Sequence, residues 1–266
     1  MDSTHYIIGA IAGDVIGSCY EWHNVKTTDF TLFSGHSRFT DDSVLTFATM
    51  DCLLNNKGYA ETYHKYGNDY PHAGYGGKFK GWLHSDDLKP FNSWGNGSAM
   101  RVSPVGWAFN TLDEVLEQAK ASAEVTHNHP EGIKGAQAVA SSVFLARTGK
   151  TKDEIKQYIT ETFSYDLDRK IDDIRPHYEF DVSCQGSVPE AIIAFLESTD
   201  YENAIRLAIS LGGDSDTIGC ITGGIAEAFY KNVPENIVDN VLDLVPPNFV
   251  ELLEKFSMKY KNNLIK

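Results

Sequence analysis

The chain has 266 residues, of which 42% are hydrophobic and 23% charged, so it is long and apolar enough to bury a sizeable core. Its formal net charge is -14, and no cluster of Lys and Arg is present, which argues against nucleic acid as a partner. Four scattered cysteines form no Cys-x-x-Cys. With no signal-peptide pattern and no apolar run near the roughly 20 residues of a membrane span, we expect a reduced, cytoplasmic protein.

The first predicted helix begins near Ile7 and is rich in small residues. Its glycines recur every four residues on one face, at Gly9, Gly13 and Gly17. This spacing lets another helix approach closely. Asp14 lies inside this apolar helix, and Glu21 follows two turns later, roughly on the same face. Charged residues usually reach water or find a partner, so we favour a structural role for both. Asp14 is expected to bond to the end of a neighbouring helix, and Glu21 to lie at a solvated helix terminus.

Two short segments are unusually rich in oxygen side chains, and each precedes an apolar helical run. They are Thr40-Asp41-Asp42-Ser43 and Asp214-Ser215-Asp216-Thr217, the second preceded by Gly212-Gly213. Either could be an ordinary helix start, where such residues cap the first turn. One cap needs one oxygen, however, and three or four exceed that need. The surplus predicts a site for Mg²⁺ or Mn²⁺, provided that the fold brings the two segments together.

Between residues 55 and 94 the sequence lacks a clear period, which predicts functional loops around short helices. The stretch leads to Gly95-Asn96-Gly97, a loop that opens onto a helix and could hold a phosphate through backbone N–H groups. A turn without a ligand is the alternative. Nearby aromatic side chains could stack a purine or pack in the core. These are Phe91, Trp94 and Phe109.

The rest of the chain is predicted to be helical. Helices are expected over residues 112–123, 135–146, 190–196, 201–211 and 218–230, with two more between 234 and 266 separated by Pro246-Pro247. Pro189 falls near the first turn of its helix, where proline is tolerated. His127-x-His129 could suggest zinc, but the oxygen-rich segments favour magnesium. With no series of strands and no linker, we expect a single all-α domain over residues 1–266.

The combination of these motifs resembles the ADP-ribosylglycohydrolase family. That family includes the dinitrogenase reductase-activating glycohydrolases and the serine- and arginine-type ADP-ribosyl hydrolases of animals. The matching segments occur in the family's order and extend over most of the chain. They are Gly13-Asp14-x-x-Gly17 with Glu21, Phe39-Thr40-Asp41-Asp42-Ser43, Gly95-Asn96-Gly97-Ser98-Ala99-Met100-Arg101, Thr126-His127, and Gly212-Gly213-Asp214-Ser215-Asp216-Thr217.

The resemblance implies an orthogonal helix bundle with two Mg²⁺ or Mn²⁺ ions in a central cleft. The implied metal ligands are Thr40, Asp41, Asp42, Asp214, Asp216 and Thr217. The implied substrate contacts are Ser93, Trp94, Gly95, Asn96, Gly97 and Ser98, with His127 lining the cleft. Glu21 matches the acidic residue that, in serine-type members, lies on a flexible segment and takes part in proton transfer.

The expected function is metal-dependent removal of ADP-ribose from serine- or arginine-linked protein, by attack at the anomeric carbon of the distal ribose. Three alternatives remain open at this level. The substrate could be a small derivative such as O-acetyl-ADP-ribose. The protein could be a non-catalytic ADP-ribose binder or structural member, or a phosphohydrolase that cleaves the diphosphate. We expect a monomer without a membrane partner.

Overall fold

The computed structural model describes residues 6–261, and in this part of the chain every regular element is a helix. This confirms the all-α fold class. None of the described helices is long and apolar enough to cross a membrane. The helices are α1 (Gly9–Gly17), α2 (Asp41–Asn55), α3 (Tyr59–Asp69), α4 (Gly77–Leu83), α5 (Gly97–Met100), α6 (Ser103–Ala108), α7 (Leu112–Glu124), α8 (Pro130–Arg147), α9 (Lys152–Phe163), α10 (Ile171–Ile174), α11 (Cys184–Glu197), α12 (Tyr201–Ser210), α13 (Ser215–Tyr230), α14 (Glu235–Leu244) and α15 (Pro247–Tyr260).

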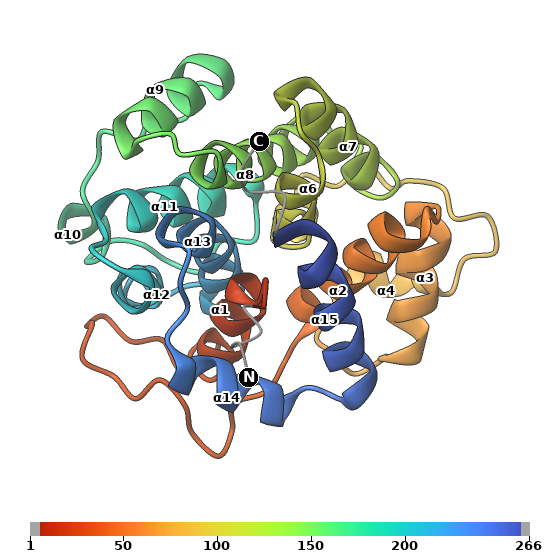
Figure 1. Cartoon of the computed structure of the whole chain (residues 1–266), viewed down its shortest axis with the longest axis horizontal. Coiled ribbons are helices and arrows are strands. Elements are labelled where there is room, and N and C mark those ends of the chain that lie inside the picture. The colour runs from red at the N-terminus through yellow and green to blue at the C-terminus, as the bar shows by residue number, and fades with distance from the viewer. Residues whose placement is uncertain (1–5, 262–266) are drawn as a thin grey trace.

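Helix α13 is the central element of the fold. All its residues from Ser215 to Ala228 are buried, and it packs against α1, α8, α11 and α12, which surround it in Figure 1. Its sequence is apolar or small on every side, which is typical of a helix enclosed by neighbours rather than one facing water. The start of this buried helix therefore lies in the interior.

The small-residue face of α1 packs directly against the backbone of α13. A Cβ atom added at Gly13 would lie 2.0 Å from the carbonyl oxygen of Gly219, and one at Gly17 would lie 2.4 Å from that of Ser215. Only glycine permits this approach, as the four-residue spacing predicted. The contact brings Asp14 of α1 close to the first turn of α13, where it bears on the site described below.

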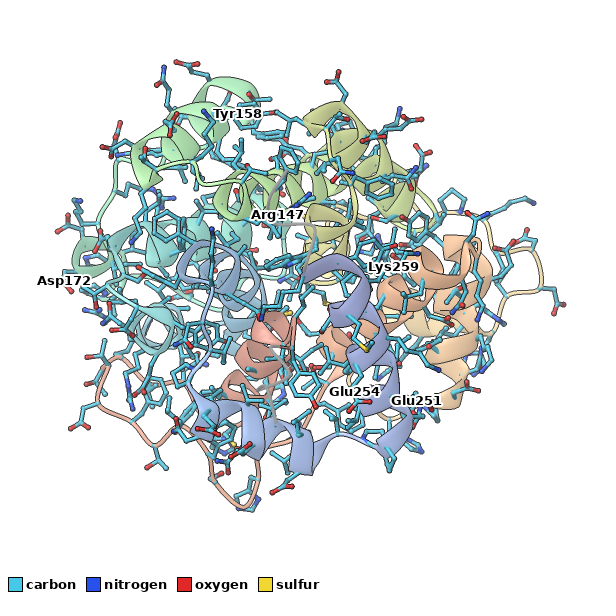
Figure 2. All side chains as sticks on the ribbon, viewed as in Figure 1. Arg147, Tyr158, Asp172, Glu251, Glu254 and Lys259 are labelled. Carbon is cyan, nitrogen blue, oxygen red and sulfur yellow. The ribbon has the colours of Figure 1, made fainter. Side chains whose placement is uncertain are left out.

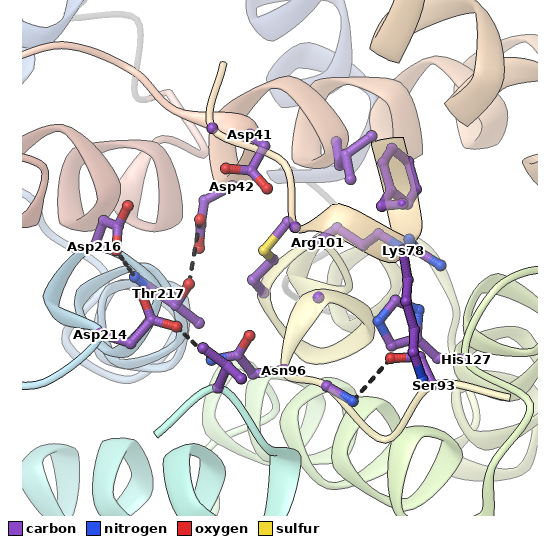
Figure 3. A pocket seen from close by; sticks show the side chains of 18 of the residues that line it. Asp41, Asp42, Lys78, Ser93, Asn96, Arg101, His127, Asp214, Asp216 and Thr217 are labelled. Carbon is purple, nitrogen blue, oxygen red and sulfur yellow. Dashed lines mark hydrogen bonds between the residues drawn. The ribbon is translucent and has the colours of Figure 1, made fainter. Parts of the chain in front are cut away.

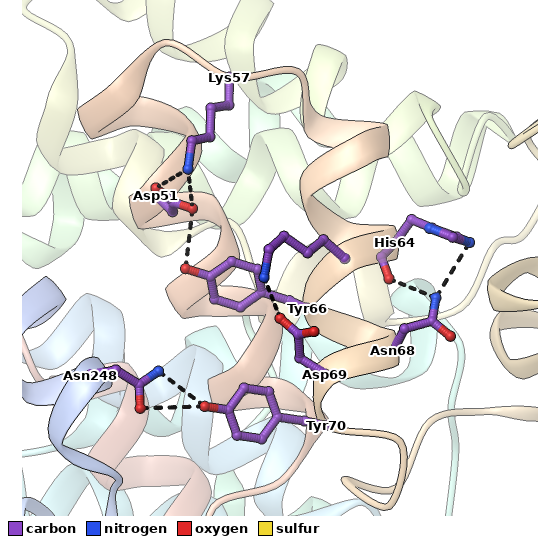
Figure 4. Close-up of polar contacts among 9 residues, drawn as sticks. Asp51, Lys57, His64, Tyr66, Asn68, Asp69, Tyr70 and Asn248 are labelled. Atoms are coloured by element: carbon purple, nitrogen blue, oxygen red, sulfur yellow. Dashed lines mark hydrogen bonds and ion pairs between the residues drawn. The ribbon is translucent and has the colours of Figure 1, made fainter.

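A second group of helices, α2, α3 and α15, is held together by aromatic and polar contacts. The ring of Phe249 stacks on Phe47 with 4.2 Å between centroids. Asp51 of α2 accepts hydrogen bonds from Lys57 Nζ at 2.9 and 3.0 Å and from Tyr66 of α3 at 3.2 Å, which Figure 4 shows. These contacts fix α2, the helix that carries the first acidic segment.

Charged side chains lie on the outside of the bundle. Asp172, Glu251 and Lys259 are exposed and point outward from their helices in Figure 2. The acidic residues that are buried instead, among them Asp14, Asp42 and Asp216, thus form an exceptional group.

Several boundaries differ from the sequence predictions. Helix α11 begins at Cys184, so Pro189 lies inside it rather than in its first turn. The Ser183 side chain accepts a hydrogen bond from Gly186 N and starts the helix earlier than the proline suggested. Helices α3 and α4 are short helices of the kind expected between residues 55 and 94, and the tyrosines of α3 recur on one face. The second C-terminal helix ends at Tyr260, and residues 262–266, included in that prediction, lie outside the described residues.

Candidate active site

The first acidic segment forms the start of α2. Thr40 is the N-cap, and its hydroxyl accepts a hydrogen bond from Asp42 N. The carboxylate of Asp14 accepts from the backbone N–H groups of Thr40 at 2.9 Å and Ser43 at 3.1 Å. The prediction that Asp14 bonds to a neighbouring helix end is therefore confirmed. With the cap supplied by Thr40 and Asp14, the carboxylates of Asp41 and Asp42 are free for another use.

The second acidic segment forms the start of α13, and its geometry depends on two glycines. Gly212 and Gly213 have φ of +73° and +79°, values that side-chain-bearing residues rarely adopt. The carboxylate of Asp214 makes no capping bond to its own helix. It accepts instead from Asn96 Nδ2 at 2.7 Å. The turn thus directs Asp214 away from its helix and toward the loop at residues 95–97.

The two segments meet, as predicted from the sequence. Thr217 Oγ1 of α13 donates to Asp42 Oδ2 of α2 at 3.2 Å, a contact drawn in Figure 3. Carboxylate oxygens of two overlapping groups lie within 4.8 Å of one another: Asp14, Asp42 and Asp216 in one, and Glu21, Asp214 and Asp216 in the other. Five carboxylates from distant parts of the chain are therefore gathered at one place.

Such a cluster is electrostatically unfavourable by itself. Burial, together with the charge of neighbouring carboxylates, raises the pKa of Asp41, Asp42 and Asp216 well above the ordinary value. Asp42 Oδ1 is buried and has no hydrogen-bond partner among the described residues. An unpaired buried carboxylate oxygen next to other carboxylates is suited to a cation. The donor set of carboxylate and hydroxyl oxygens fits a hard divalent metal ion.

Glu21 lies at the edge of the cluster. The sequence predicted it at the end of a helix, but the structure places it in a loop. Helix α1 ends at Gly17, so Glu21 belongs to the loop that follows. This prediction was wrong because Ser18, which ends the helix, donates its hydroxyl back to the carbonyl of Val15. Burial and then the charge of Asp214 raise the pKa of Glu21 to about 7, which suits a group that exchanges a proton near neutral pH.

A pocket of about 360 Å³ opens beside the acidic cluster, a volume within the range of small-molecule sites. Eleven of the residues singled out from the sequence line it: Glu21, Asp41, Asp42, Ser93, Gly95, Asn96, Gly97, His127, Asp214, Asp216 and Thr217. The loop from Ser93 to Gly97 forms part of its wall, and the hydroxyl of Ser93 accepts a hydrogen bond from Gly95 N at 3.1 Å.

Three other residues singled out from the sequence do not line the pocket. Thr40 is buried behind Asp42, and its hydroxyl lies 2.7 Å from Asp14 Oδ1. The Ser98 hydroxyl donates to the carbonyl of Gly132 at 2.7 Å. The ring of Trp94 faces outward and is 46% exposed. Of the candidate aromatic residues, Phe91 is the one that lines the pocket.

The end of the pocket opposite the acidic cluster carries basic and aromatic residues for which no role was predicted from the sequence. Lys78, Phe79 and Arg101 line it, and Figure 3 shows Lys78 and Arg101 beside His127, across the view from Asp214 and Asp216. Phe180 also lines the pocket, but it stacks on Trp22, the neighbour of Glu21. Gly76-Gly77 before Lys78 was an available signal, since glycines often border ligand loops. No sequence signal marked Phe180. The pocket therefore has an acidic end and a basic end.

Comparisons with known proteins agree with this geometry. The family model described as ADP-ribosylglycohydrolase matches residues 4–263. ADP-ribosylhydrolase ARH3 from Homo sapiens is 30% identical, covering 86% of each chain. A putative ADP-ribosyl glycohydrolase from Acanthamoeba polyphaga mimivirus is 29% identical, covering 89% of each chain.

A solved structure described as an ADP-ribosylglycohydrolase-related protein complex has the same fold. It superposes with a TM-score of 0.74 at 19% identity and covers 96% of both chains. The family match over nearly the whole chain and the level of identity to the human relative lead to one conclusion. The chain belongs to the ADP-ribosylglycohydrolase family and is an ADP-ribosyl hydrolase.

Proposed function

We propose that this protein is a metal-dependent hydrolase that removes ADP-ribose from serine- or arginine-linked protein side chains, by attack at the anomeric carbon of the distal ribose. The observation that carries the proposal is the meeting of the starts of α2 and α13 at one end of the pocket. In this proposal the carboxylates would lie beside the distal ribose, and the rest of the pocket would take the nucleoside diphosphate.

The acidic end is the proposed metal site. Its ligands would be Thr40, Asp41, Asp42, Asp214, Asp216 and Thr217, with Asp42 Oδ1 available because it has no other partner among the described residues. Two divalent ions there would supply orientation of the ribose hydroxyls and activation of a water. The protein itself would hold these oxygens in place, through the cap of Thr40 and Asp14 at the start of α2 and through the glycine turn before α13.

Glu21 is the proposed proton-transfer residue. Its carboxyl group shares the acidic end with Asp214 and Asp216, and its pKa of about 7 lets it hold or release a proton at neutral pH. The neighbouring Trp22 stacks on Phe180, with ring centroids 5.2 Å apart, and both line the pocket. This pair would cover the ligand and limit the access of water.

The test is release of ADP-ribose from serine-linked and arginine-linked protein substrates with Mg²⁺ present. Free ADP-ribose from at least one substrate is expected, and Asp216→Ala should abolish it. Asp172→Ala, which changes an exposed aspartate that is not among the residues lining the pocket, is the control. No release from either protein by a metal-loaded sample, with turnover of O-acetyl-ADP-ribose instead, would redirect the proposal to small derivatives. Adenosine monophosphate as product would indicate cleavage of the diphosphate.

A further inference from the structure

Arg101 is an unusual cation, because it is fully buried at the basic end of the pocket. Its Nη2 donates to the carbonyl of Ser122 at 2.7 Å and to the hydroxyl of Thr126 at 2.9 Å. Its guanidinium carbon lies 4.1 Å from the ring centroid of Tyr63, and Nε and Nη1 have no hydrogen-bond partner among the described residues. A guanidinium can only donate hydrogen bonds, so the oxygen of Thr126 must act as acceptor toward Arg101.

The same hydroxyl also contacts His127. Thr126 Oγ1 lies 2.7 Å from His127 Nδ1. Thr126 is buried, and within residues 6–261 its hydroxyl has no partner other than these two. If Nδ1 carried the proton, the hydroxyl would accept twice and its own proton would be left buried without an acceptor, at a cost. The hydroxyl therefore donates to Nδ1, and the ring proton is on Nε2.

A second proton on His127 is disfavoured. Burial and the positive charge of Arg101 lower the pKa of His127 well below its ordinary value. The ring is thus neutral, with Nδ1 as acceptor and Nε2 as donor.

The Nε2 atom faces the loop that forms the pocket wall. A Cβ atom added at Gly97 would lie 3.0 Å from His127 Nε2, and one added at Gly95 would lie 3.6 Å away. Glycine at both positions keeps the space in front of this nitrogen clear. Figure 3 shows His127 beside Ser93 and Arg101 on the side of the view away from the acidic residues. The donor therefore points into the part of the pocket left for the diphosphate.

We propose that Arg101 and Thr126 are positioning residues that hold His127 as a fixed Nε2–H donor for a diphosphate oxygen of the ligand. The identity of the ligand rests on the proposed function; the state of the ring does not. In this chain of contacts Arg101 fixes the hydroxyl of Thr126, which in turn fixes the tautomer. The donor is then oriented before the ligand arrives, so no reorientation is needed on binding.

The first experiment observes the histidine nitrogens in the ligand-free full-length protein, by ¹⁵N-detected NMR of a histidine-labelled sample. A His127→Gln sample assigns the signals. We expect a non-protonated Nδ1 and a protonated Nε2 in the wild type and in Thr126→Ser, which keeps the hydroxyl. Thr126→Val, which removes it, should give a mixture of tautomers or the reverse one. A protonated Nδ1 in the wild type, or no change in Thr126→Val, would overturn the proposal.

The second experiment measures affinity by calorimetry for ADP-ribose and for adenosine, which lacks the diphosphate. Thr126→Val should bind ADP-ribose about tenfold more weakly, as for a lost hydrogen bond to a charged group, while Thr126→Ser and the affinity for adenosine stay unchanged. Thr222→Val is the matched control, because Thr222 is a buried threonine that donates to the carbonyl of Ala191. An equal loss of affinity for adenosine in Thr126→Val would show a general structural effect and would overturn the positioning role of Thr126.

The outcomes separate this proposal from the proposed function. If the wild type binds no ADP-ribose, the proposed function fails, and the NMR result still decides the state of His127. If Thr126→Val does not fold, the NMR measurement on the wild type still tests the proposal, because a protonated Nδ1 on His127 would contradict it.

Discussion

At the scale of single residues, the site separates groups that bind from a group that transfers a proton. The buried carboxylates at the starts of α2 and α13 are held in place by hydrogen bonds. Asp42 and Asp216 accept from the hydroxyl and the backbone N–H of Thr217, and Asp214 accepts from Asn96. Glu21 comes from a loop, and no hydrogen bond from another helix fixes its carboxylate among the described contacts. A residue on a loop can approach and leave a ligand, whereas metal ligands require fixed geometry.

The first prediction concerns Glu21. Glu21→Gln should lower kcat by about 10²-fold or more, the size of a lost general acid or base, because glutamine keeps the shape but cannot exchange a proton. Affinity for ADP-ribose, measured by calorimetry with Mg²⁺, should stay within about twofold of the wild type, since the other contacts are intact. Unchanged turnover in this variant would exclude Glu21 from proton transfer, and lost affinity would make it a binding residue instead.

At the scale of helices, the contact between α1 and α13 determines whether the site forms. A methyl group at Gly13 would lie 2.0 Å from the backbone of Gly219, and the backbone cannot move aside as a flexible side chain could. We predict that Gly13→Ala lowers the free energy of unfolding by about 3 kcal/mol or more.

The control for Gly13→Ala is Gly81→Ala in α4, where an added Cβ would meet no atom within 4 Å. It should leave stability unchanged or raise it by up to about 1 kcal/mol, because alanine is the better helix former. Urea unfolding followed by circular dichroism measures both. Equal changes in the free energy of unfolding would contradict the prediction. They would show that Gly13 is not needed for the close packing of α1 on α13.

The contact between α2 and α3 gives a prediction about pH. Burial would raise the pKa of Asp51, but hydrogen bonds from Lys57, Asn55 and Tyr66 outweigh it and lower the pKa. A lowered acid pKa contributes stability that is present above the unfolded value of about 3.9 and is lost as pH falls through the folded value. Asp51→Asn should therefore cost about 1–2 kcal/mol at neutral pH, and this cost should shrink below about pH 4.

Urea titrations of Asp51→Asn at pH 7 and at acid pH measure this difference, with the exposed Asp239→Asn as the control. A cost that is the same at both pH values would show that Asp51 acts through packing rather than through its charge.

Much of this element-level structure was predictable, and the exceptions have physical reasons. The spacing of Gly9, Gly13 and Gly17 predicted a close helix contact because small residues every four positions share a face. The start of α11 was not predicted, since Pro189 is a strong local signal but the cap at Ser183 decides where the helix begins. Helix α3 is one of the short helices expected between residues 55 and 94, but its bounds were not predicted, because its pattern relies on tyrosines, which suit either a loop or a core.

At the scale of the whole molecule, the acidic part of the site was predictable, and much of the rest of the pocket was not. Four oxygen side chains in a row exceed what a cap needs, so Asp41 and Asp216 could be singled out from local sequence. Lys78 and Phe180 lie on segments far apart in the sequence, and only the packing of the helices places both at the pocket. The outward direction of Trp94 likewise depends on contacts with Lys78 and His129.

The acidic cluster also makes a prediction for the stability of the entire fold. Without cations, the folded protein holds Asp41, Asp42 and Asp216 at pKa values well above the ordinary one. Such groups bind protons more tightly when folded, so their contribution to stability is full below the unfolded value of about 3.9 and is lost as pH rises through the folded values. Metal-free protein should therefore lose stability toward neutral and alkaline pH, and Mg²⁺ should restore it.

Thermal melting with EDTA or with Mg²⁺ at pH 5 and pH 8, at matched ionic strength, measures the effect. We expect the rise in Tm caused by Mg²⁺ to be larger at pH 8, where protons no longer compete for the carboxylates. Asp42→Asn removes one buried charge without changing its shape, so in EDTA at pH 8 it should melt higher than the wild type, yet respond little to Mg²⁺. Asp239→Asn should behave as the wild type does. A Mg²⁺ effect that is equal at both pH values, or that Asp42→Asn retains, would place the ion elsewhere, because a cation held by this cluster must compete with its protons and needs the oxygen that Asp42 leaves unpaired.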